Sequence, residues 1–185
     1  LREGRFQQVL EGYQQLPDSL KKDKSLLLMR LSAASELDEK AYEQAIDAFQ
    51  KAYPHDAALQ LVSIEREFTR KRYAEARAAI DRLDKLVNDP YLNVLRASTY
   101  VEEQNYERAL ECARKAAEQE KDLAAAYWSQ VTISLKKKDF VETTRLLTFI
   151  EQELHIPIVD LTALPEYAEY VKSPQYAAFA KRKGK

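Results

Sequence analysis

The apolar residues of this chain follow a regular pattern in which an aromatic residue is followed three positions later by a small or apolar residue. The pairing occurs five times, as Phe6 with Val9, Tyr42 with Ala45, Tyr73 with Ala76, Tyr106 with Ala109, and Phe140 with Thr143. Successive aromatic members of these pairs are 36, 31, 33 and 34 residues apart. Two short helices and two turns occupy about 34 residues, so the spacing predicts tandem helical hairpins.

Within each repeat the apolar residues recur in steps of three and four, which places them on one face of an α-helix. One such stripe follows each aromatic residue, for example Ala109, Ala113 and Ala116 after Tyr106. A second apolar stripe precedes the aromatic residue; its members are Leu28, Leu31 and Ser35, then Leu61, Ile64 and Phe68, then Asn93, Ala97 and Tyr100, then Tyr127, Val131 and Ser134. Pro54 and Pro90 fall between repeats, where a helix has to end.

Two stretches of the chain resemble the tetratricopeptide repeat family. Residues 95–110 contain LRASTY and QNYERAL, and residues 40–46 read KAYEQAI, with Phe49 and Ala52 continuing the stripe. The resemblance covers about residues 1–154. It implies an all-α fold, a right-handed α-solenoid of tandem helical hairpins.

The resemblance also implies about four and a half repeats in a domain spanning residues 1–154, with the first helix of the first repeat missing. Leu1 matches the last turn of that helix, so we expect the chain to be part of a longer protein. The usual glycine-like position of the first helix in each repeat reads Ser32, Glu65, Ala97 and Val131. A charged Glu65 at a close-packed position indicates either looser packing or a register that differs by one residue.

The repeat pattern ends after Leu154, and residues 155–185 form a C-terminal extension with a basic tail. Pro165 and Pro174 are each followed two residues later by a tyrosine, and a proline at a helix start predicts two short helices here. Because the end of a helical-repeat array exposes an apolar face, we expect a C-terminal helical cap. The alternative is that this segment folds back and occupies the groove of the array.

Composition narrows the possible functions. Lysine and arginine number 29 against 30 aspartates and glutamates, so the chain has no bulk field to attract nucleic acid or an anionic membrane. Its uncharged apolar runs are too short to cross a bilayer, and its three glycines form no phosphate-binding loop. Neither His55 nor His155 has a second histidine or a cysteine beside it. We therefore expect no enzymatic activity, no cofactor and no metal.

In the resembling family the first helix of each hairpin lines a concave groove, which implies a partner-binding surface. The expected groove residues are Met29, Val62, Arg66, Tyr91, Val94, Trp128 and Leu135. The family's lysine-and-asparagine clamp for acidic C-termini is absent, because the matching positions read Met29, Ala33, Leu95 and Trp128. Such a groove suits an extended apolar segment or a helix, and Tyr91 and Trp128 are the aromatic anchors we expect.

The sequence thus predicts a non-enzymatic protein–protein interaction scaffold or adaptor that binds a peptide or helix of a partner. The alternative is a structural subunit whose groove is filled by its own residues 156–180, with partners bound elsewhere. A minor alternative, a helical-repeat RNA binder, rests on the basic runs at residues 136–138 and 181–183 and is disfavoured by the net charge of −1. A cytoplasmic or periplasmic location and homo-oligomerisation both stay open.

Overall fold

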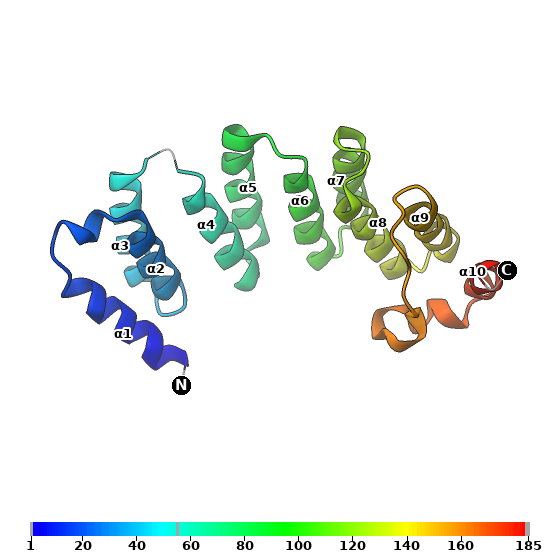
Figure 1. Cartoon of the computed structure of the whole chain (residues 1–185), viewed down its shortest axis with the longest axis horizontal. Helices are drawn as coiled ribbons and strands as arrows, with labels where there is room; N and C mark the ends of the chain where they lie inside the picture. The colour runs from blue at the N-terminus through cyan, green and yellow to red at the C-terminus, as the bar shows by residue number, and fades with distance from the viewer. Residues whose placement is uncertain (1, 55, 184–185) are drawn as a thin grey trace. The chain divides into compact units, whose positions relative to one another are not determined.

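The computed structural model describes residues 2–54 and 56–183, and these residues form α-helices, short 3₁₀ helices and connecting turns (Figure 1). The chain divides into two compact units, residues 1–88 and 89–185. The helices of unit 1 are α1 (Arg2–Gln14), η1 (Leu20–Lys22), α2 (Lys24–Ser35), α3 (Glu39–Ala52), α4 (Ala58–Thr69) and α5 (Tyr73–Val87). Those of unit 2 are α6 (Tyr91–Glu102), α7 (Tyr106–Gln119), α8 (Ala124–Lys136), α9 (Phe140–Gln152), η2 (Leu161–Ala163), η3 (Pro165–Tyr167), η4 (Tyr170–Lys172) and α10 (Pro174–Lys183).

Consecutive helices pack against each other within each unit. In unit 1, α2 packs on both α1 and α3, and α4 packs on α5. In unit 2, α6, α7, α8 and α9 pack in chain order. The first helices of neighbouring hairpins also touch, α2 with α4 and α6 with α8. Each unit is therefore a short stack of helical hairpins, and no helix among the described residues is long and apolar enough to span a membrane.

One turn geometry closes three of the hairpins. Lys71, Gln104 and Lys138 have positive φ angles of 59°, 58° and 57°. In the middle case the N–H of Asn105 donates to the Tyr100 carbonyl at 2.8 Å, and the N–H of Gln104 donates to the Val101 carbonyl at 3.0 Å. The other two turns repeat both bonds, and this pair of bonds defines the Schellman motif. The three turns are spaced by 33 and 34 residues, so the repeat is present in the backbone as well as in the sequence.

The turns correct the register that the sequence predicts for α4. Seven residues before the three positive-φ positions lie Ile64, Ala97 and Val131, which are all buried, whereas Glu65 is exposed. The close-packed residue of α4 is therefore Ile64, and the predicted register is one residue off. Of the expected apolar stripe of α4, Ile64 is buried, whereas Leu61 is 53% exposed and Leu59 is buried in its place.

Small residues let the helices of unit 2 approach one another closely. Ala97 of α6, Ala109 and Ala113 of α7, and Ile133 of α8 form one cluster, and all four are fully buried. Ala45 and Ala76, the alanines at the matching positions of α3 and α5, are fully buried as well. The predicted role of these alanines as close-packed positions agrees with their burial.

The C-terminal segment packs on α8 and α9. Its Ile158, Leu161, Tyr167, Tyr170 and Phe179 join Val131, Leu146, Leu147 and Ile150 in one core cluster. Tyr170 is fully buried, and its hydroxyl lies 2.8 Å from that of Thr144 on α9. Short helices begin at Pro165 and Pro174, as the sequence predicts, although the first of them is a single 3₁₀ turn.

The Schellman turns make a testable prediction, because a residue with a side chain is strained at positive φ and glycine is not. We expect Gln104→Gly to stabilise unit 2 by about 0.5–1 kcal/mol after the entropic cost of glycine is deducted. Urea denaturation measures the change. Gln104→Ala is the control, because it removes the same side chain but keeps the strain. A glycine variant no more stable than the alanine variant would contradict the strain argument.

Candidate partner-binding surfaces

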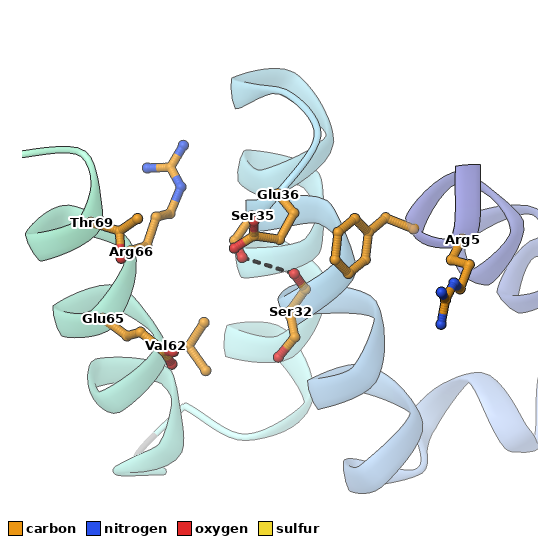
Figure 2. A pocket seen from close by; sticks show the side chains of 9 residues that line it. Arg5, Ser32, Ser35, Glu36, Val62, Glu65, Arg66 and Thr69 are labelled. Carbon is orange, nitrogen blue, oxygen red and sulfur yellow. Dashed lines mark hydrogen bonds between the residues drawn. The ribbon is translucent and has the colours of Figure 1, made fainter. Parts of the chain in front are cut away.

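Unit 1 contains an open cavity of about 590 Å³ between α1, α2 and α4 (Figure 2). Its lining residues are Arg5 and Phe6 of α1, Ser32, Ser35 and the adjoining Glu36 of α2, and Val62, Glu65, Arg66 and Thr69 of α4. In Figure 2 the side chain of Val62 faces α2 across this space, and Ser32 and Ser35 lie on the opposite wall. A volume of this size is in the range of ligand pockets in proteins.

Arg66 lines this cavity, but its guanidinium group serves the protein's own structure. The guanidinium carbon lies 3.8 Å from the centre of the Tyr42 ring. Arg66 also donates hydrogen bonds to Glu39 at the start of α3 and to its neighbour Glu67. Figure 2 shows the guanidinium extending away from Val62. A cation that stacks on an aromatic ring and pairs with two carboxylates is compensated, so Arg66 has little charge left for a partner.

The other groups around Arg66 tie three helices together. Arg70 donates to Glu39 at 2.8 Å and to the Ser35 carbonyl at 2.8 Å, and Arg72 donates to Glu67 at 3.0 Å. The hydrogen bond from Arg66 holds the pKa of Glu39 below its ordinary value. The network therefore fixes how α2, α3 and α4 meet at one end of the cavity.

Unit 2 contains a second open cleft, of about 600 Å³, between α8 and the C-terminal segment. One wall consists of Trp128, Thr132, Leu135 and Lys136 on α8, together with Lys138 and Phe140 at the following turn. The opposite wall consists of the residues from Pro165 to Tyr170 in η3 and η4. We call this space the α8 cleft. Its walls come from parts of the chain that are far apart in sequence.

Two tyrosines of the C-terminal segment belong to the wall of the α8 cleft that faces α8. Tyr167 is 6% exposed and Tyr170 is fully buried. Burial raises the pKa of Tyr167 to about 12 and also raises the pKa of Tyr170. Both shifts reflect how deeply the two rings are buried in the C-terminal segment.

The structure brings some of the predicted groove residues together and separates others. Val62 and Arg66 line the cavity of unit 1, while Trp128 and Leu135 line the α8 cleft. Met29 and Tyr91 are each 44% exposed, and neither lines either of these two cavities. Val94 is only 8% exposed, because it packs with Ala116 and Ala126, so a partner would reach little of it.

Sequence reasoning missed the residues that complete each cavity. Phe6 enters the unit 1 lining from the helix before the first complete hairpin. Tyr167 enters the α8 cleft from the segment after the last hairpin. The repeated spacing of proline and tyrosine in the C-terminal segment was the only sequence signal that involved Tyr167. That spacing predicts where helices start, but it does not predict which surface the tyrosine lines.

Among residues 2–54 and 56–183, no group of three or more histidine, cysteine, aspartate or glutamate side chains could hold a metal ion. His55 lies outside the described residues, and burial raises the pKa of the lone Cys112 thiol. No protein-family model, curated protein or solved structure matches this chain.

Proposed function

We propose that this chain is a non-enzymatic interaction scaffold that binds a segment of another polypeptide on the faces lined by α2, α4 and α8. The observation that carries the proposal is that predicted groove residues line open cavities in both units, Val62 in unit 1 and Trp128 and Leu135 in unit 2. Both cavities have mixed polar and apolar walls, which suits a peptide better than a small metabolite.

We further propose that the hairpins are repeats of the tetratricopeptide kind. Three features support this: the Schellman turns recur every 33 or 34 residues, the matching alanines are fully buried, and first helices of neighbouring hairpins touch. In such arrays each repeat depends on its neighbours for burial of its apolar faces. A cap formed by residues 155–183 on α9 fits that requirement.

The alternative function, a groove filled by the chain's own C-terminal segment, has one observation in its favour. The turn from Pro165 to Tyr170 forms a wall of the α8 cleft and so lies beside Trp128. However, a space of about 600 Å³ stays open between that turn and α8, and the buried side chains of the segment pack mainly with residues of α9. A cap that leaves the cleft free accounts for both facts better.

The scaffold proposal can be tested by site-specific photocrosslinking in cells. A benzophenone amino acid placed at Thr69 or Thr132, which are exposed in the two cavities, should form covalent adducts with a partner polypeptide. The same amino acid at Gln44 on α3 or Lys115 on α7, exposed positions outside both cavities, serves as the matched control. Adducts confined to the control positions would favour the alternative function, and adducts at no position would refute the scaffold.

A further inference from the structure

The two ends of α4 are attached to the preceding hairpin in different ways. At the first turn of α4, Leu59 is buried in the core cluster of α2 and α3, which includes Leu27 and Phe49. Just before that turn, Asp56 pairs with Lys24 at the start of α2. Burial of apolar surface therefore holds this end of α4 in place, independently of the charges at the other end.

The last turn of α4 is attached by charged groups. Glu39, at the start of α3, accepts hydrogen bonds from Arg66 and Arg70. The Arg72 guanidinium, in the turn that follows α4, lies 3.9 Å from the same carboxylate. Arg70 also donates to the Ser35 carbonyl at the end of α2, at 2.8 Å. Because a helix rises about 1.5 Å per residue, this ionic attachment begins about 10 Å along α4 from its buried first turn.

Of the two carboxylates in this network, Glu39 joins α4 to the preceding hairpin, whereas Glu67 belongs to α4 itself. The Arg66 side chain is only 3% exposed, so its charge depends on partners that the protein supplies. Without the charge of Glu39, three arginines would share the single carboxylate of Glu67. Their repulsion would then act against the packing of the last turn of α4 on α3.

The ionic end of α4 borders the open cavity of unit 1. Arg66 and Thr69 of α4 line this cavity, and so do Ser35 and the adjoining Glu36 of α2. In Figure 2, Thr69 and Ser35 lie at the same end of the cavity, on different helices. A movement of the last turn of α4 away from α2 and α3 therefore widens the cavity at this end.

We propose that Glu39 is a clasp that sets the width of the unit 1 cavity, with α4 pivoting about its apolar first turn. While Glu39 is charged and paired, the last turn of α4 stays packed against α2 and α3, and the cavity is narrow. When Glu39 is neutralised, the arginines repel one another and the cavity opens. This conformational device goes beyond the proposed scaffold function, because it sets the geometry of the cavity whether or not a partner binds there.

Distances between spin labels, measured by pulsed electron paramagnetic resonance in the full chain, test the clasp. Cysteines at the exposed residues Ser32 and Thr69 carry one label pair across the cavity, and cysteines at the exposed residues Ser25 and Leu61 carry a second pair across the pivot. Cys112→Ser removes the native thiol from labelling. We expect Glu39→Gln to lengthen the distance across the cavity by several ångströms and to leave the distance across the pivot unchanged.

The matched control is Glu43→Gln, which removes the same charge one turn further along α3, at an exposed position outside the bonds to the arginines. It should leave both distances as they are in the wild type. The proposal is wrong if Glu39→Gln leaves the distance across the cavity unchanged, or if the control lengthens that distance equally. An equal change in both label pairs would show a general loosening of unit 1 and would reject the pivot.

A second variant keeps the test decisive if Glu39→Gln unfolds unit 1, which loss of helical circular dichroism would reveal. Arg70→Gln removes an exposed arginine and its bonds to Glu39 and to the Ser35 carbonyl, while Arg66 keeps both of its carboxylate partners. We expect this variant to stay folded and to lengthen the distance across the cavity by less than Glu39→Gln does. An unchanged distance in a folded Arg70→Gln chain would overturn the clasp.

Discussion

Ala109→Glu should unfold the hairpins of unit 2 while the core of unit 1 stays intact. Ala109 is fully buried among Ala97, Ala113 and Ile133, which belong to α6, α7 and α8. A glutamate there must displace helices on two sides and bury a carboxylate with no partner. Each effect alone costs several kcal/mol, and a domain of this size is stable by about 5–15 kcal/mol. We therefore expect more than 4 kcal/mol of destabilisation, measured by urea denaturation.

Hydrogen exchange shows where the damage falls. Amides of α6, α7 and α8 should lose protection together, because the substituted residue touches both hairpins of unit 2, whereas amides around Phe49 in unit 1 should stay protected. The control is Arg108→Glu, which places the same residue one position earlier, on the exposed side of the first turn of α7. It should change the free energy of unfolding by less than about 0.5 kcal/mol. Loss of protection limited to α7 would show that the hairpins are independent.

The sequence predicts the hairpins well because their signals are local. An aromatic residue, an alanine three positions later and apolar steps of three and four define a helix and its buried face, and α5, α7 and α9 each begin at the predicted aromatic residue. In α4 the same signals are ambiguous, because leucine, valine and isoleucine crowd residues 59–64 and support more than one register. The φ angle of Lys71 resolves the register, and a backbone angle cannot be read from residue types.

The candidate sites are harder to predict, because they depend on contacts between distant segments. Nothing near Arg66 in the sequence indicates that Tyr42 and Glu39, on another helix, occupy its guanidinium group. Likewise, the cleft beside Trp128 exists only because residues from Pro165 to Tyr170 return to α8. A helical periodicity identifies the face of one helix but gives no information on what covers that face.

The largest effect on unit 2 should come from ending the chain after Leu154. This truncation removes the five buried apolar side chains from Ile158 to Phe179 and leaves Leu147 and Ile150 of α9 exposed to water. Loss of Tyr170 alone, a fully buried aromatic residue, corresponds to a core truncation costing about 3–5 kcal/mol. We expect the shortened chain to unfold at much lower urea concentration and to aggregate, measured by denaturation and light scattering.

A shorter truncation after Ala180 provides the control, since it keeps all five of those buried side chains. It loses the basic tail, together with the hydrogen bond from Arg182 to Thr148 and the contact of Arg182 with the Phe179 ring. It should reduce stability by about 1 kcal/mol at most. The two truncations then distinguish a C-terminal segment that caps α9 from one that fills the groove. A segment that covers the apolar face of α9 is needed for solubility, so its loss causes aggregation. If the segment instead fills a groove, its removal should leave a soluble and equally stable chain that binds peptides beside Trp128 more tightly than before. That result would favour the structural subunit over the scaffold.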